Sequence, residues 1–138
     1  CLPGTREGTL KTIHEHLSTT CGRIVWLRGS PGTGKSAICK TVASTLHDQG
    51  KLAGSFFFDK RGGSGGTSTV DLFISTLIFQ LASFSPEFRM TLGKRLAGDP
   101  LLAEASPTSQ LNKILLEAAR EVAFPPSYVI VIDALDEC

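Results

Sequence analysis

The stretch Gly29-Ser30-Pro31-Gly32-Thr33-Gly34-Lys35-Ser36 decides how this chain is interpreted. It fits the pattern G-x-x-x-x-G-K-[ST] at every fixed position. Glycines let a backbone wrap closely around phosphate oxygens, and successive N–H groups then point into the concavity. Lys35 can reach the β- and γ-phosphates of a nucleotide, and the Ser36 hydroxyl can bind Mg²⁺. The stretch therefore predicts a nucleotide-binding loop with these candidate residues: Gly29, Ser30, Pro31, Gly32, Thr33, Gly34, Lys35, Ser36 and the adjoining Ala37.

The segments around this loop predict an α/β fold. Residues 23–28 form a short apolar, β-branched run that we expect to be a buried strand with Trp26 in the core. A helix to about His47 follows the loop, and its positive N-terminal end points at the same anion. Residues 54–59 and 128–132 predict a second and a third strand.

Helical spacing of apolar residues predicts further helices between these strands. Ser85-Pro86 and Ser106-Pro107 each read as a cap followed by proline at the first helical position. Strands that alternate with helices and are uniformly apolar predict a parallel sheet covered on both faces. The helices expected besides the one after the loop span 7–19, 69–82 (with Leu72, Leu77, Ile78 and Leu81 facing inward), 86–98 and 107–122.

The last predicted strand ends in an acidic cluster. Asp133 directly follows the apolar run 128–132, where we expect it to hold Mg²⁺ through a bound water. Asp136 and Glu137 come three and four residues later, and either carboxylate could orient or deprotonate the attacking water. The alternative interpretation, without a catalytic role, is a solvated acidic loop after a strand.

Composition and charge limit the classes of protein to which the chain can belong. The 138 residues make one domain, and 41% apolar with 20% charged residues is ordinary globular usage. The formal net charge of +1 provides no field to collect nucleic acid or an anionic membrane. No apolar run is long enough to span a bilayer, and no leader peptide is visible. The chain starts at Cys1 and its only methionine is Met90, so we expect a piece of a longer protein.

The four cysteines lie far apart, at positions 1, 21, 39 and 138. A zinc site would need closely spaced pairs, and a disulfide framework would need a denser set. We therefore expect reduced thiols in a cytoplasmic compartment, with Cys39 as a small buried hydrophobic residue.

Together these residues resemble NACHT-domain NTPases of the signal-transduction (STAND) class, in particular the large fungal, NLR-like set. The most diagnostic part is the close of the chain, where the small Ala134 follows Asp133 and the acidic pair comes later. Related ATPases more often place a glutamate directly after that aspartate. The resemblance also covers the segments 1–6 (Cys1-Leu2-Pro3-Gly4-Thr5-Arg6), 24–27, 36–38 and 54–58.

The resemblance implies the N-terminal part of a P-loop NTPase domain with a three-layer α/β/α fold. Related parallel sheets have the strand order 5-1-4-3-2, and this chain would stop after its third strand, which carries Asp133 as the Walker B residue. By analogy Thr5 and Arg6 lie near the nucleotide base, which is adenine in some members and guanine in others. The expected parts are 1–22 (lead-in and helix), 23–49 (Walker A strand, loop and helix), 50–127 (second strand and helices) and 128–138 (Walker B strand).

The function implied is a switch operated by ATP or GTP with Mg²⁺, with slow hydrolysis controlling homo-oligomerisation. Such domains typically lie between an effector domain and a repeat array of one long cytoplasmic chain, and in fungi they are linked to non-self recognition and cell death. One alternative is an assembly module that binds nucleotide without hydrolysing it. Another, a nucleic-acid motor, is disfavoured by the near-neutral charge. Because the fourth strand is missing, we expect the isolated chain to be marginally stable and a weak or inactive NTPase.

Overall fold

A computed structural model of the chain describes residues 4–19, 24–58, 69–125 and 127–134. Helices and strands alternate along it, as the sequence predicts. The elements in chain order are α1 (Glu7–Thr19), α2 (Lys35–Asp48), β1 (Leu52–Phe57), α3 (Thr69–Phe84), α4 (Pro86–Gly98), the 3₁₀ helix η1 (Pro100–Glu104), α5 (Pro107–Ser109), the π-helix η2 (Gln110–Leu116), α6 (Glu117–Arg120) and β2 (Val129–Asp133).

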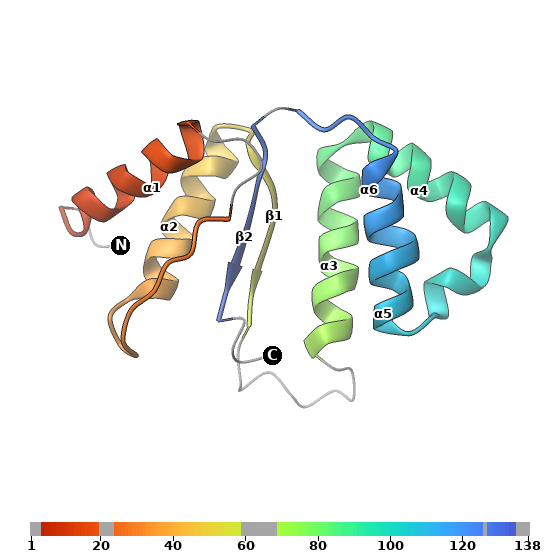
Figure 1. Cartoon of the computed structure of the whole chain (residues 1–138), viewed down its shortest axis with the longest axis horizontal. Coiled ribbons are helices and arrows are strands. Elements are labelled where there is room, and N and C mark those ends of the chain that lie inside the picture. The colour runs from red at the N-terminus through yellow and green to blue at the C-terminus, as the bar shows by residue number, and fades with distance from the viewer. Residues whose placement is uncertain (1–3, 20–23, 59–68, 126, 135–138) are drawn as a thin grey trace.

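The two strands of the described chain form a parallel pair, so the protein is an α/β protein. Gly54 pairs with Ile130 and the register continues to Phe57 and Asp133, after an irregularity next to Leu52. Figure 1 shows α1 and α2 on one side of the strands and α3, α4 and α6 on the other. The predicted strands 54–59 and 128–132 are thus confirmed, with bounds shifted by one or two residues.

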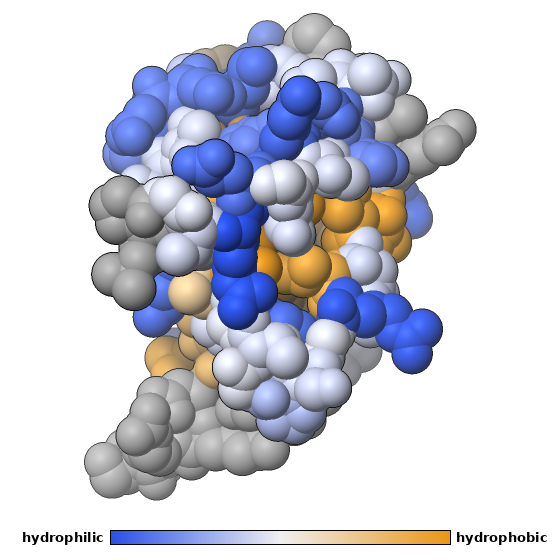
Figure 2. Space-filling model, turned by 90° about the vertical axis from the view of Figure 1, so that its left-hand side faces the viewer, coloured by the Kyte–Doolittle hydropathy of each residue, from blue (hydrophilic) through white to orange (hydrophobic). Residues whose placement is uncertain are grey.

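The predicted strand at 23–28 is wrong for its described part. Residues 24–28 belong to no strand, and the Trp26 side chain, expected in the core, is 72% exposed. The physical reason is that a strand needs a neighbour to accept its N–H and C=O groups, whereas β1 and β2 pair only with each other among the described residues. Figure 2 views the molecule from the side of α1 and shows hydrophobic surface exposed to solvent on that side.

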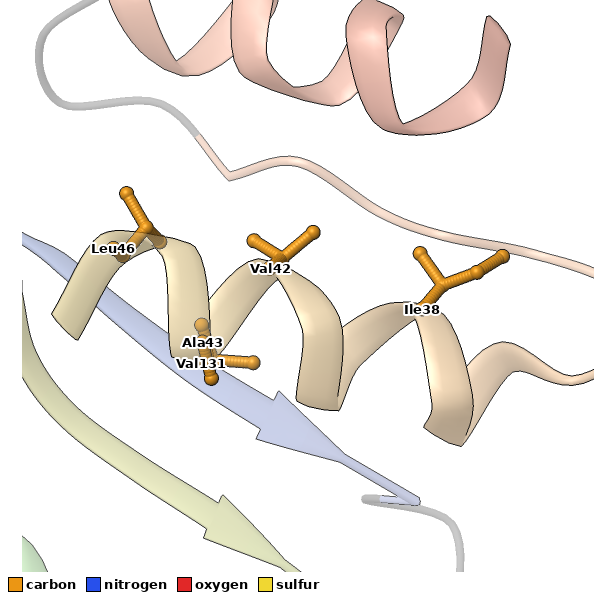
Figure 3. Close-up of a cluster of buried hydrophobic side chains, with 5 residues drawn as sticks. All are labelled: Ile38, Val42, Ala43, Leu46 and Val131. Carbon is orange, nitrogen blue, oxygen red and sulfur yellow. The ribbon is translucent and has the colours of Figure 1, made fainter. Parts of the chain in front are cut away.

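One hydrophobic cluster fixes α2 between the sheet and α1. Ala43 faces Val131 of β2, whereas Ile38, Val42 and Leu46 project away from the strand (Figure 3). Leu10, Ile13, Leu17 and Leu27 pack against that outer side. The helix ends where the sequence predicts, because Gly50 takes φ 66 and Lys51 N–H donates to the Leu46 carbonyl at 2.8 Å.

A second cluster joins β1 to the helices beyond it. Phe88 of α4 is fully buried there, and the Ser85 hydroxyl caps α4 by accepting a hydrogen bond from Phe88 N–H at 3.2 Å. The predicted cap and helix are therefore confirmed. Leu72 is an exception among the residues expected to face inward, since it is 46% exposed near the start of α3. The other buried members of the cluster are Ala53, Leu81, Leu115 and Ala118.

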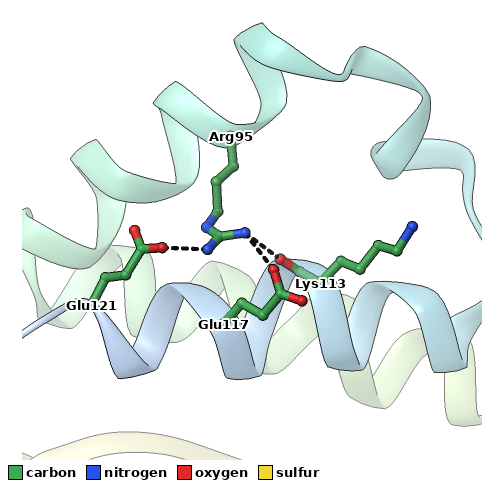
Figure 4. Close-up of polar contacts among 4 residues, drawn as sticks. All are labelled: Arg95, Lys113, Glu117 and Glu121. Atoms are coloured by element: carbon green, nitrogen blue, oxygen red, sulfur yellow. Dashed lines mark hydrogen bonds and ion pairs between the residues drawn. The ribbon is translucent and has the colours of Figure 1, made fainter.

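The helix predicted over 107–122 is interrupted by the π-helix η2. Arg95 of α4 crosses to this region, where its Nη1 donates to the Lys113 carbonyl at 3.1 Å and to Glu117 at 2.8 Å (Figure 4). Its Nη2 pairs with Glu121. Through these contacts Arg95 holds α4 against η2 and α6. None of the described helices is long and apolar enough to cross a membrane.

The outer edge of β1 is closed by a side chain. Gln80 of α3 accepts a hydrogen bond from Ser55 N–H at 2.7 Å and donates one to the Ser55 carbonyl at 3.1 Å. The amide thus satisfies both backbone groups as a neighbouring strand would. A Cβ on Gly54 would lie 3.0 Å from the same amide oxygen, so a side chain there would crowd the Gln80 amide.

Candidate functional site

The glycine-rich loop (residues 29–36) turns tightly and leads directly into α2. Gly32 and Gly34 take φ values of 76 and 82, a conformation that side chains rarely adopt. Within the loop, Thr33 Oγ1 donates to the Ser30 carbonyl at 2.7 Å. The predicted loop-to-helix transition at Lys35 is confirmed.

The N-terminus of α2 is open to an anion. Its N-cap residue is Gly34, which supplies no side-chain hydrogen bond, and no acidic residue lies in the first turn. Ser36 and Ala37 in that turn are exposed. Uncapped N–H groups and the helix dipole both favour negative charge at such an end.

Lys35 folds back across the loop. Its Nζ donates to the Gly29 carbonyl at 2.8 Å and to the Ser30 carbonyl at 3.2 Å. A Cβ on Gly29 would lie 3.0 Å from Thr33 Oγ1, so a side chain there would crowd the Thr33 hydroxyl within the loop. The ammonium group is thus held at the concave side of the loop, where it can exchange a carbonyl for a phosphate oxygen.

Asp133 lies at the end of β2 and faces the start of α2. Asp133 is 8% exposed and lies beside the thiol of Cys39, one helical turn beyond Ser36. Burial, the charge of Asp133 and hydrogen bonding to its side chain, in that order, raise the pKa of Cys39 to about 11. The acid from β2 is thereby brought to the helix that follows the glycine-rich loop.

The backbone conformation of Ala134 explains why a small residue follows Asp133. It takes φ 55, in the left-handed region that bulky side chains avoid. The candidate catalytic residues Asp136 and Glu137 lie outside the described residues.

Arg6, expected near a nucleotide base, lies against the glycine-rich loop. Its Nη2 is 3.2 Å from the position that a Cβ on Gly34 would take, and its Cζ and Nε are 3.4 Å from it. Thr5 is exposed beside it. The structure therefore brings together four parts of the predicted site: Arg6, residues 29–36, the first turn of α2 and Asp133.

The donor set suits a magnesium–nucleotide complex. Mg²⁺ prefers hard oxygen ligands and binds few protein groups when phosphates supply the rest. The Ser36 hydroxyl in the first turn of α2 and the Asp133 carboxylate at the end of β2 are oxygen donors of this kind. Lys35, Arg6 and the N-terminus of α2 provide the positive charge that a triphosphate requires.

One family model matches nearly the whole length of the chain. The family described as "Nephrocystin 3, N-terminal" matches residues 4–138. The chain belongs to this family. The nephrocystin 3 N-terminal match includes residues 29–36, Asp133, Asp136 and Glu137. No curated protein and no solved structure matches the chain significantly.

Two contacts of the site were not predicted from the sequence. The contact of Arg6 with Gly34 joins residues far apart in the chain, and no local pattern indicates it. The contact of Cys39 with Asp133 had a partial signal, since Cys39 lies one turn after Lys35 on α2. That spacing places Cys39 on the same side of the helix as the loop.

Proposed function

We propose that this chain binds a purine nucleoside triphosphate with Mg²⁺ at the glycine-rich loop and hydrolyses it slowly, as the nucleotide switch of a NACHT-type signalling protein. The observation that carries the proposal is the convergence on the start of α2. A complete G-x-x-x-x-G-K-S loop with an uncapped helix N-terminus receives Asp133 from β2 through the Cys39 contact.

Each residue has a separate role in this proposal. The loop N–H groups and Lys35 bind the phosphates, while Ser36 and Asp133 hold Mg²⁺, which neutralises charge on the phosphates. Asp136 or Glu137 orients the water that attacks the γ-phosphorus, and the products are the nucleoside diphosphate and inorganic phosphate. Conversion between the two nucleotide states would then control homo-oligomerisation in the cytoplasm.

The proposal extends to the fold, a three-layer P-loop sheet in which another strand lies between residues 24–28 and β2. The edge of β2 away from β1 supports it, because its backbone groups have no partner strand among the described residues. The extended segment 24–28 has no partner strand among the described residues. Gln80 bonds to the opposite edge at Ser55, so in the described part of the chain β2 offers the open edge of the sheet.

Titration of the purified protein with fluorescent ATP and GTP analogues, with Mg²⁺ and with EDTA, tests the binding. A charge-assisted hydrogen bond contributes about 1.5–3 kcal/mol, so Lys35→Ala should bind roughly 10- to 100-fold more weakly. Lys40→Ala removes an exposed lysine further along the same helix and should leave the affinity unchanged. Asp133→Asn should remove the Mg²⁺ dependence.

Two results would contradict the proposal in different ways. Equal binding by Lys35→Ala and the parent protein would show that the glycine-rich loop is not the site. The second result is saturable binding without phosphate release, unchanged when Asp136 and Glu137 are replaced together. It would show that the chain is an assembly module that binds nucleotide without hydrolysing it.

A further inference from the structure

The Arg6 guanidinium lies at the glycine-rich loop, and among the described residues it has no counter-charge. Its Nη2 lies 3.2 Å from where a Cβ on Gly34 would stand, and no carboxylate of the described residues forms an ion pair with it. Arg6 also takes φ 59, which is uncommon for a residue other than glycine. A cation placed this close to the start of α2 must respond to any anion that binds there.

Arg6 also directly precedes α1, which begins at Glu7. Its carbonyl accepts the hydrogen bond from Leu10 N–H at 3.0 Å, which closes the first turn of the helix. A shift of Arg6 therefore moves the start of α1, because the side chain contacts the loop and the carbonyl bonds to the helix.

The attachment of α1 to the rest of the protein is weak. None of its residues is buried, and only Leu10, Ile13 and Leu17 pack against the α2 cluster, each half-buried. A groove of about 840 Å³ separates α1 from residues 24–27 and includes Trp26. Elements with few buried contacts open locally at low free-energy cost, so α1 is free to change how firmly it is docked.

We propose that Arg6 couples nucleotide binding at the glycine-rich loop to the docking of α1. Bound phosphate attracts the guanidinium and holds Arg6 against Gly34, and α1 then packs more firmly against α2. This regulation rests on the proposed function, because it needs an anionic ligand at the loop. By linkage, firmer docking of α1 also raises the affinity for the nucleotide by the same factor.

Hydrogen exchange of peptides that cover α1 tests the coupling, with and without saturating MgATP. We expect the α1 amides to exchange about 5- to 20-fold more slowly with nucleotide. Trp26, the single tryptophan, should show a blue shift in emission as the groove narrows. In Arg6→Gln at saturating nucleotide both responses should be lost, whereas Arg89→Gln, an exposed arginine on α4, should behave as the parent protein does.

A double-mutant cycle separates coupling from a simple phosphate contact. Leu17→Ala loosens α1 at the end far from Arg6 and should weaken nucleotide binding about 2- to 5-fold in the parent protein, but not in Arg6→Gln. Nucleotide binding with unchanged α1 exchange would overturn the coupling and leave the proposed function standing. Faster α1 exchange on binding, or equal slowing in Arg6→Gln, would also overturn it. Absence of binding to the parent protein would overturn the proposed function and the coupling with it.

Discussion

Replacement of Gln80 by methionine should destabilise the protein by about 2–4 kcal/mol. The change keeps the length of the side chain but removes both hydrogen bonds to Ser55, at 2.7 and 3.1 Å. Each bond contributes about 0.5–1.5 kcal/mol net, and the half-buried N–H and C=O of Ser55 lose further free energy when left without a partner. For a chain of this length the loss corresponds to a fall in Tm of roughly 10 °C.

Urea unfolding followed by circular dichroism measures this loss, with Gln49→Met at the exposed end of α2 as the control. Gln80→Glu refines the test. The ionised carboxylate can still accept from Ser55 N–H but repels the Ser55 carbonyl, whereas the protonated acid can serve both groups. Gln80→Glu should therefore be closer to the parent protein at pH 4.5 than at pH 7.5. If Gln80→Met unfolds within 0.5 kcal/mol of the parent protein (roughly the scatter of surface substitutions), the amide does not hold the edge of β1.

Two further predictions concern the Ser85 cap and the thiol beside Asp133. Ser85→Ala removes the acceptor for Phe88 N–H at the start of α4 and should cost about 1 kcal/mol in urea unfolding, whereas Ser44→Ala, at an exposed position on α2, should cost less. Cys39 with a pKa of about 11 should react with iodoacetamide at pH 8 about 100-fold more slowly than a thiol of ordinary pKa, as followed by mass spectrometry of its peptide without added magnesium. Because the pKa is raised in the folded state, this thiol stabilises the protein below about pH 9 and the contribution is lost as the pH rises through 11. Alkylation at the rate of free cysteine would contradict the contact with Asp133.

Features of this chain that depend on neighbouring residues could be predicted from the sequence. The transition from the glycine-rich loop to α2, the stop at Gly50 and the cap at Ser85 all follow from local backbone chemistry. The spacing of apolar residues also predicted the α-helices, but it did not predict the π-helical turns of η2 near Lys113.

Features that depend on distant partners could not be predicted in the same way. Residues 24–28 have the composition of a strand, but a strand exists only where another backbone pairs with it. The position of Arg6 on Gly34 and the bonds between Gln80 and Ser55 are likewise tertiary contacts with no periodic signal. The candidate site was therefore predictable in its motifs and unpredictable in the contacts that join them.

The Gln80 contact also has a consequence for the order in which the protein folds during synthesis. Gln80 follows Ser55 by 25 residues, whereas β2 follows the whole of α3 to α6. Once α3 leaves the ribosome it can cover one side of β1 while the growing chain still lacks β2. When β2 emerges, only the correct side of β1 is available to it. We therefore expect this amide to protect the nascent strand from other chains and to direct its later partner to the proper side.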